Sequence, residues 1–253
     1  MIGPDHPLFH SRYTRSNAYE PHWVYENQMG PHALWLLESL TEVLPIEPGM
    51  RVLDLGCGRA MTSIFLAREF EAEVWASDLW IAADDNEARI RAAGVDDLVH
   101  AVHAEAHQLP FAPEQFDVVV SIDAYQYFGT ADLYLGALLP FVRGGGRVGI
   151  VVPAVFAEFG ADVPPELQPY WEWEFCCFHG PDWWRTHLAK TGLVDVDIAD
   201  AVPDGWRDWL RFDEVTGPML EGWRRDAAAN SAAMLRADHG RHLGFSRVVA
   251  SKR

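Results

Sequence analysis

The stretch Arg51-Val-Leu-Asp-Leu-Gly-Cys-Gly-Arg-Ala-Met-Thr-Ser-Ile-Phe-Leu66 decides the fold. A short apolar run ends in two glycines separated by one residue, and an apolar, helix-compatible segment follows from Met61 to Phe70. A strand, a glycine turn and a helix in this order bring backbone amides close to a nucleotide-like ligand and point the helix N-terminus at it. Gly56 and Gly58 can adopt positive φ and carry no Cβ that would block the ligand. The turn predicts a nucleotide-like site, although a dinucleotide site or a turn without a ligand could use the same residues.

Short apolar runs alternate with helix-compatible segments along most of the chain. The run Phe116–Ile122 is apolar on both sides, which is typical of a central parallel strand that helices cover on both faces. This alternation predicts an α/β fold with a doubly wound, seven-stranded and mainly parallel sheet of the Rossmann-like type. The predicted strands cover residues 51–55, 73–77, 99–102, 116–122, 147–152, 193–198 and 245–250, and the predicted helices cover residues 31–44, 61–70, 84–93, 131–142, 181–190 and 217–238.

Composition and charge restrict the classes of function. The chain has 253 residues, of which 49% are hydrophobic, so it can bury a large core. Its formal net charge of −17 would repel a polyanion, and no basic patch of any length stands out, so nucleic acid is not an expected partner. No apolar run reaches the roughly 20 residues of a membrane span, and residues 1–7 do not resemble a signal peptide. Three cysteines make no disulfide framework, which favours a cytoplasmic location.

Three acidic residues lie in or after successive predicted strands. Asp54 precedes Gly56 by two residues, where its carboxylate can hold the glycine turn through backbone amides and lie beside a ligand's ammonium group. Asp78 ends the second strand, where an acidic side chain can accept hydrogen bonds from ribose hydroxyls. Glu105 follows the third strand, where it could meet an adenine edge. Because open α/β sheets bind ligands at the carboxyl ends of their strands, we expect all three acids at one site.

Five segments of the chain resemble the motifs of the class I S-adenosylmethionine-dependent methyltransferases, and they occur in the same order as those motifs. The resemblance covers roughly residues 46–152. It departs from the family at the third small position of the glycine turn, where Ala60 should still fit with a less close backbone approach. The matching segments are residues 52–58, Asp78, and residues 104–111, 116–123 and 144–150.

The resemblance implies that S-adenosylmethionine is the cofactor. Gly56 and Gly58 would then face its methionine part, Asp78 its ribose, and residues 121–123 would lie under its sulfonium. Glu105 and Ala106 would approach its adenine. Together with the residues considered on their own chemistry, the expected cofactor-binding residues are Tyr13, Asp54, Gly56, Cys57, Gly58, Asp78, Leu79, Glu105, Ala106 and Asp123.

The segments outside the motifs are expected to cover the site. The N-terminal arm and the insertions at residues 154–180 and 200–243 are rich in aromatic residues and predict a lid, with Tyr13 or Tyr19 closing over the cofactor. We expect a single methyltransferase domain over residues 1–253, with an arm and helix at 1–45, a cofactor-binding core at 46–152, and substrate-side insertions with the last strands at 153–253.

Candidate catalytic residues follow from the chemistry of methyl transfer. In-line displacement at a sulfonium requires alignment, exclusion of water and often removal of a proton from the acceptor. The candidates for that proton are Asp123 and Tyr127, after the fourth strand, and His179. Residues 121–129 are similar to the cyclopropane fatty acid synthase branch, but Gln126 and Tyr127 replace the glutamate and histidine of that branch, so lipid cyclopropanation is not expected.

The sequence therefore predicts an enzyme that transfers a methyl group from S-adenosylmethionine to a small molecule. A catalytically silent S-adenosylmethionine-binding regulatory protein, a lipid or C-methyltransferase and a nicotinamide-dependent oxidoreductase are the alternatives. A homodimer is an open alternative, since aromatic residues of the second insertion could form a subunit contact. No metal is expected, because Cys176, Cys177 and His179 have no second Cys/His pair at zinc spacing.

Overall fold

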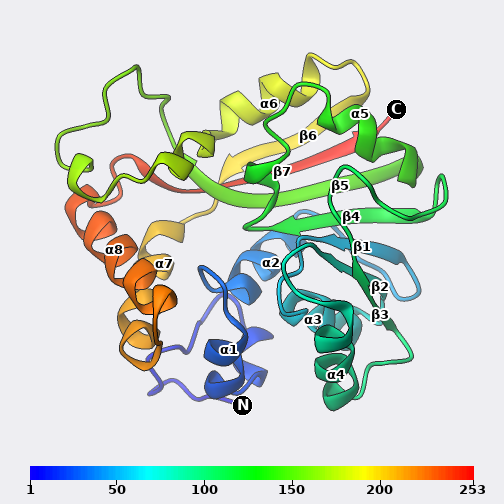
Figure 1. The fold of residues 1–253 in the computed structure, drawn as a ribbon, viewed down its shortest axis with the longest axis horizontal. Coiled ribbons are helices and arrows are strands. Elements are labelled where there is room, and N and C mark those ends of the chain that lie inside the picture. The colour runs from blue at the N-terminus through cyan, green and yellow to red at the C-terminus, as the bar shows by residue number, and fades with distance from the viewer.

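All seven predicted strands pair in one sheet in the computed structural model, which describes residues 1–253 (Figure 1). The strand order is β3-β2-β1-β4-β5-β7-β6. Strand β7 is antiparallel to both of its neighbours, and the other strands run parallel to one another. The predicted fold is therefore confirmed. The strands are β1 (Arg51–Leu55), β2 (Glu73–Asp78), β3 (Val99–His103), β4 (Phe116–Ile122), β5 (Val142–Val155), β6 (Val194–Ala201) and β7 (Leu243–Lys252).

Eight α-helices surround this sheet, and most agree with the predicted segments. Helix α3 has the predicted bounds, and α4 ends at Gly94 in a left-handed conformation, as expected of a glycine after a helix. The helices are α1 (Pro21–Asn27), α2 (Ala33–Thr41), α3 (Met61–Phe70), α4 (Ala83–Ala93), α5 (Tyr134–Leu138), α6 (Pro181–Ala189), α7 (Gly205–Thr216) and α8 (Trp223–Asp238).

Three local predictions were wrong. Helix α2 begins at Ala33 and not at Pro31, because Nδ1 of His32 accepts the N–H of Trp35 and caps the helix. The helix predicted at 131–142 is reduced to the short α5 and a 3₁₀ turn. Helices α1 and α7 lie in segments for which no helix was predicted.

The glycine run at 144–146, predicted as a turn before the fifth strand, lies inside β5. It forms an irregularity in the ladder, since Phe116 of β4 pairs with Val142 and Val118 already pairs with Arg147. Gly145 has a φ of +69°, a conformation that glycine adopts readily and that allows the strand to bulge at this point.

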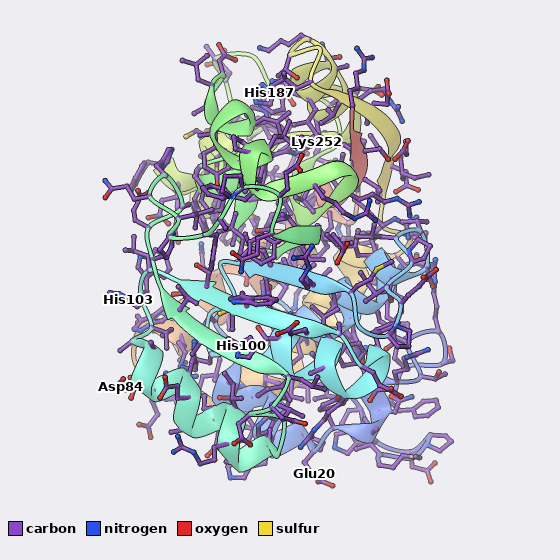
Figure 2. The ribbon with its side chains drawn as sticks, turned by 90° about the vertical axis from the view of Figure 1, so that its right-hand side faces the viewer. Glu20, Asp84, His100, His103, His187 and Lys252 are labelled. Atoms are coloured by element: carbon purple, nitrogen blue, oxygen red, sulfur yellow. The ribbon has the colours of Figure 1, made fainter.

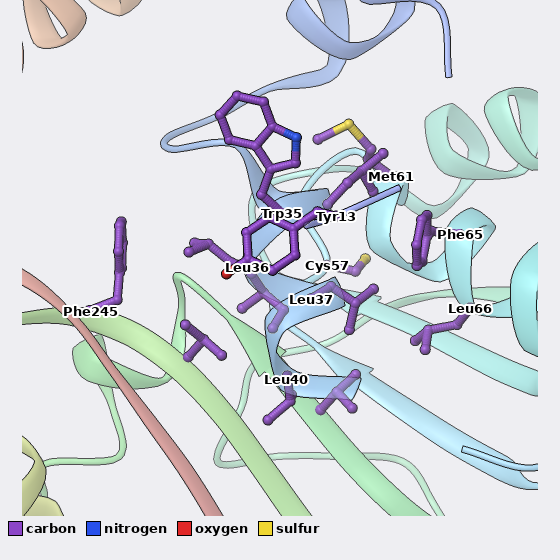
Figure 3. Packing of buried hydrophobic residues seen from close by; sticks show 14 of the residues in the cluster. Tyr13, Trp35, Leu36, Leu37, Leu40, Cys57, Met61, Phe65, Leu66 and Phe245 are labelled. Carbon is purple, nitrogen blue, oxygen red and sulfur yellow. The ribbon is translucent and has the colours of Figure 1, made fainter. Parts of the chain in front are cut away.

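Each face of the sheet buries its own apolar cluster. Val52 contributes to the larger cluster and the next residue, Leu53, to the smaller one, because side chains alternate along a strand. The larger cluster packs α2 and α3 against the sheet, as Leu37, Leu40 and Phe65 show in Figure 3. The smaller cluster includes side chains of α5 and α6.

The β3 edge of the sheet and the pair of helices α7 and α8 lie on opposite sides of the molecule (Figure 1). Figure 2 looks towards the β3 edge, with His100 and His103 on that strand and Asp84 on α4. Helices α7 and α8 pack on each other at the opposite side of the molecule, beside α1 in Figure 1. No helix combines the length and the apolar character that a membrane crossing requires.

Candidate active site

The glycine turn after β1 is held tightly against the neighbouring strands. The N–H groups of Gly56 and Cys57 both donate to the carbonyl oxygen of Ser77, at 2.8 and 3.1 Å. Gly56 has a φ of +77°, and a Cβ built on it would lie 2.4 Å from the Cβ of Ala124. The turn therefore requires glycine both for its backbone conformation and for its packing.

Asp78 holds the turn from the end of β2. Its Oδ2 accepts the N–H of Gly58 at 2.8 Å, and its Oδ1 accepts the N–H groups of Trp80 and Ile81 at 2.7 and 3.0 Å. A carboxylate offers about four acceptor positions, so one remains for a ligand. Asp78 thus fixes the loop and still presents an acceptor to the site.

Asp54 does not act as expected from the sequence. Its Oδ2 accepts the hydroxyls of Thr62 and Ser63, both at 2.6 Å, so the side chain ties β1 to α3 and contacts no amide of the glycine turn. It is buried beneath the site and does not line it. Burial raises the pKa of Asp54 to about 6.

A cavity of about 250 Å³ opens above the carboxyl ends of β1 to β4. It brings together most of the residues proposed for cofactor binding and catalysis, and it leaves out Asp54, Tyr13 and His179. The hydroxyl of Ser77 is buried in its wall without a hydrogen-bond partner. The proposed site residues that line the cavity are Gly56, Cys57, Gly58, Asp78, Leu79, Glu105, Ala106, Asp123 and Tyr127.

Glu105 lies at the β3 side of this cavity. Its Oε1 bonds Nδ1 of His107 at 2.7 Å, and this contact lowers the pKa of Glu105. The carboxylate is therefore an ionised acceptor at neutral pH, available for a donor on a ligand.

Asp123 lies at the centre of the site in an unusual backbone conformation. It directly follows β4, has a φ of +54°, and its N–H donates to the carbonyl oxygen of Val151 at 2.8 Å. Nε2 of Gln126 donates to its Oδ1 at 3.2 Å. Burial raises the pKa of Asp123 to about 7. Strained backbone and a perturbed carboxyl in a cavity together mark a functional position.

Comparison with known proteins agrees with this geometry. Residues 52–146 match the family model described as a methyltransferase domain. These residues are therefore similar to a methyltransferase domain. The matched stretch includes the glycine turn, the ends of β1 to β4 and Asp123.

Two curated relatives and one solved structure illustrate the similarity. The chain is 29% identical to erythromycin 3''-O-methyltransferase from Saccharopolyspora erythraea over 194 residues, which are 70% of this chain and 62% of that protein. It is 26% identical to 27-O-demethylrifamycin SV methyltransferase from Amycolatopsis mediterranei, covering 91% of this chain and 85% of that one. The chain spans less than two thirds of the length of the first curated relatives: it covers 62% of the erythromycin methyltransferase and 50% of methyltransferase GfsG from Streptomyces halstedii.

The solved structure supports the fold. Geranyl diphosphate C-methyltransferase from Streptomyces coelicolor A3(2) superimposes with a TM-score of 0.70 at 16% identity, covering 98% of this chain and 86% of that chain. At 16% identity this likeness shows only that the two proteins have the same arrangement of strands and helices.

The N-terminal arm covers the cavity at the strand ends, but not with Tyr13 or Tyr19, the residues expected from the sequence. Residues 29–31 line the cavity, and a Cβ built on Gly30 would lie 2.2 Å from Oδ2 of Asp123. The carbonyl oxygen of Glu26 fixes this arm, because it accepts from Arg59 at 2.6 Å and from Arg224 at 3.3 Å. The arm segment at 27–31 is therefore held from the glycine turn and from α8.

Tyr13 and Tyr19 lie away from this cavity. Tyr13 is buried in the larger apolar cluster, and Tyr19 bonds Glu69 at 3.1 Å on the far side of the arm. Their spacing from the motifs could not reveal this, because the arm first packs on α2 and α3 and only then passes over the site.

Replacing Tyr13 with Phe tests its position. The Tyr13 hydroxyl is buried without a partner, so we expect its removal to raise the free energy of unfolding by about 1 kcal/mol. Affinity for S-adenosylhomocysteine should change less than twofold, because Tyr13 does not line the cavity. Denaturant unfolding and calorimetry measure the two quantities, and a tenfold loss of affinity would place Tyr13 at the ligand after all.

A second cavity of about 260 Å³ adjoins the first and shares a wall with it. The shared wall consists of Met29, Gly30, Pro31, Asp123 and Tyr127. Most of the remaining lining comes from in and around the 3₁₀ turn at Trp173–Cys177, from α7 and from α8, which lie in the segments that the sequence presented as insertions. Asp213 and Gln28, which sequence reasoning missed, also line this second cavity.

His179 lies outside both cavities. Its Nδ1 bonds Glu158 at 3.0 Å, and its ring stacks on Trp183 with the centroids 3.7 Å apart. The structure therefore gives no geometric support to a catalytic role of His179.

A groove of mixed charge escaped the sequence analysis. Four arginines that are far apart in the chain line it together with Glu20, Glu26 and Glu69: Arg59, Arg68, Arg89 and Arg224. The three glutamates offset most of the positive charge of this groove.

Proposed function

We propose that this protein transfers a methyl group from S-adenosylmethionine to a small-molecule acceptor. The observation that carries the proposal is the shared wall: the cavity at the strand ends meets the second cavity at Asp123. A cofactor in the first cavity and an acceptor in the second would touch there. Two relatives are named for small molecules, one as erythromycin 3''-O-methyltransferase and the other as 27-O-demethylrifamycin SV methyltransferase. These names favour a small-molecule acceptor for this protein as well.

The residues present fit this cofactor. Gly56 and Gly58 leave the methionine end free of side chains, and Asp78 offers its remaining acceptor position to the ribose hydroxyls. The unpartnered hydroxyl of Ser77 gains a partner from a polar ligand. Glu105 lies where the adenine would approach. When bound, the cofactor supplies an electrophilic methyl group on a sulfonium.

Asp123 is the group that we assign to the acceptor's proton. A carboxyl whose pKa is about 7 is partly ionised at neutral pH and can accept a proton there. Tyr127 is less suited to this role, because desolvation and the nearby Asp123 raise its pKa, so it stays protonated and cannot take up a proton as a base. The arm at residues 29–31 excludes water from this point and aligns the two ligands.

Binding and turnover are tested separately. We expect S-adenosylhomocysteine to raise the melting temperature and to give a one-site calorimetric isotherm, and NAD to do neither. A nucleophile panel with S-adenosylmethionine should then release S-adenosylhomocysteine. Stabilisation by NAD alone would favour the oxidoreductase alternative, and binding without turnover over the whole panel would favour the catalytically silent protein.

We place the protein in the cytoplasm and assign it no nucleic-acid partner. Its three free cysteines and its net charge of −17 support these assignments. Light scattering decides between a monomer and the homodimer alternative.

A further inference from the structure

Four acids line the second cavity together with apolar and neutral polar residues. Asp123 and Asp213 lie on its wall, and Glu172 and Glu174 line it as well. Arg224 is the single cationic side chain of the lining, and its guanidinium is turned to the carbonyl oxygens of the arm, at 3.3 Å from Glu26 and 3.4 Å from Gln28. The charge that this cavity presents to an occupant is therefore negative.

An unsatisfied acceptor points to the same kind of occupant. Gln28 lines the cavity and is only 3% exposed. Its Nε2 donates to Oγ1 of Thr216 at 3.3 Å, and its Oε1 is buried without any partner. A buried polar atom without a partner costs free energy. A ligand that donates hydrogen bonds would remove this cost, whereas a ligand that only accepts would not.

Much of the apolar wall is aromatic. Phe175 and Phe178 stack with centroids 4.7 Å apart, and Tyr127, Trp209 and Trp223 also line the cavity. Aromatic faces attract cations and also bury apolar groups. Such a wall suits a cation carried on an apolar body.

Asp213 and Asp123 influence each other electrostatically. Asp213 is only 5% exposed, and the hydroxyl of Ser231 donates to its Oδ2. Burial, with the charge of Asp123 as a further contribution, raises the pKa of Asp213 to about 7. A cation between the two carboxyls would favour the ionised form of both, so the pair forms a site with a preference for positive charge.

We propose that the acceptor molecule carries a protonated amine on an apolar body, and that the second cavity binds this amine with Asp213 as its counter-charge. The inference rests on the proposed function, since it identifies the class of that reaction's substrate. Asp213 recognises the amine, and Asp123, which alone of the two also lines the cofactor cavity, remains the group beside the reacting atoms. The unpartnered oxygen of Gln28 accepts a further hydrogen bond from the substrate.

A matched pair of probes tests the charge preference. We would titrate 4-phenylbutylamine and 4-phenylbutan-1-ol, which differ only in the terminal group, into the wild-type protein saturated with S-adenosylhomocysteine. We expect the amine to bind at least tenfold more tightly than the alcohol in calorimetry. Equal affinities, or no binding of the amine at millimolar concentration, would overturn the proposal.

Two variants assign the preference to Asp213. Asp213→Asn should lower the amine affinity at least tenfold and leave the alcohol affinity unchanged. Asp226→Asn is the matched control, because Asp226 is an exposed residue of α8 outside the cavity and its loss changes the net charge by the same amount. A similar loss in both variants would mean that only the overall charge matters and would contradict the role of Asp213.

The outcome is separable from that of the proposed function. Binding of S-adenosylhomocysteine is measured on each variant before the probes are added, and it should be the same in all three proteins. If the wild type does not bind S-adenosylhomocysteine, the proposed function fails. If it does bind and the amine preference is absent, only the amine inference fails. Should Asp213→Asn not fold, the wild-type comparison of amine and alcohol still decides.

Discussion

Replacing Asp123 with Asn is expected to lower the rate constant of methyl transfer by about 10²–10⁴-fold, the range typical for the loss of a general base. Asn keeps the shape of the side chain and an oxygen for the hydrogen bond from Gln126, so the site should stay assembled. Affinity for S-adenosylhomocysteine should therefore change less than about threefold, a small effect on the scale of a lost hydrogen bond. Single-turnover kinetics and calorimetry measure the two effects.

The pH dependence of the rate gives a second readout for Asp123. The active form of a base is the ionised one, so with a pKa of about 7 the rate should rise about tenfold per pH unit below 7 and level off above it. In Asp123→Asn this rise should disappear, whereas Asp213→Asn should keep it. An unchanged profile in Asp123→Asn would assign the titration to another group. The other titratable groups around the two cavities are Cys57, Arg59, Asp78, Glu105, Tyr127, Glu172, Glu174, Asp213 and Arg224.

Replacing Gly56 with Ala is expected to affect both stability and cofactor binding. The new Cβ would meet the Cβ of Ala124 at 2.4 Å, and an alanine would have to adopt a φ of +77°. Strain and overpacking together should lower the free energy of unfolding by about 2–4 kcal/mol. Because the turn cannot relax without displacing the amides that bond Ser77, affinity for S-adenosylhomocysteine should fall at least about tenfold, or 1.4 kcal/mol.

Gly49→Ala is the matched control for this substitution. Gly49 has the same φ of +77°, but nothing lies within 4 Å of a Cβ built on it. It should show only the conformational cost of about 1 kcal/mol, with unchanged affinity for S-adenosylhomocysteine. If Gly56→Ala and Gly49→Ala behaved alike, packing against Ala124 would have no role in the site.

Much of the core could be predicted because its signals are local. The apolar runs of β1 and β4, the glycines after β1 and the uninterrupted helical segment from Met61 to Phe70 each specify their structure within a few residues. The expectation that Ala60 fits the turn also agrees with the structure: it caps α3 with a φ of +58° and is fully buried. A left-handed alanine was not predictable from residue type, since alanine disfavours that conformation.

The glycine turn is held by Asp78 and not by Asp54, and this difference from the expectation has a geometric cause. Asp54 lies inside β1, so its side chain is directed to one face of the sheet, where Thr62 and Ser63 of α3 lie. Asp78 is the last residue of β2 and is adjacent to the turn, so it reaches the N–H of Gly58. Spacing along the sequence does not distinguish the two cases.

The second cavity could not be predicted, because it is assembled from distant segments. Gln28 of the arm meets Thr216 of α7, 188 residues away in the chain. Nothing in the sequence distinguishes Asp213 from the other acids of this acidic chain. Only the folded structure brings it to one cavity with the arm and α8. A single sequence carries no signal for such pairs.

The arm at residues 29–31 bears on the order of events that we expect in the proposed methyl transfer. Because the same three residues wall both cavities, we expect the cofactor to enter while the arm is displaced, and the acceptor cavity to be complete only once the arm lies over the cofactor. Initial-rate kinetics should therefore be sequential and ordered, with the acceptor binding second and the methylated product leaving first. Displacing the arm would break the contacts of Glu26 with Arg59 and Arg224, so we expect its reopening to slow the exchange of spent cofactor.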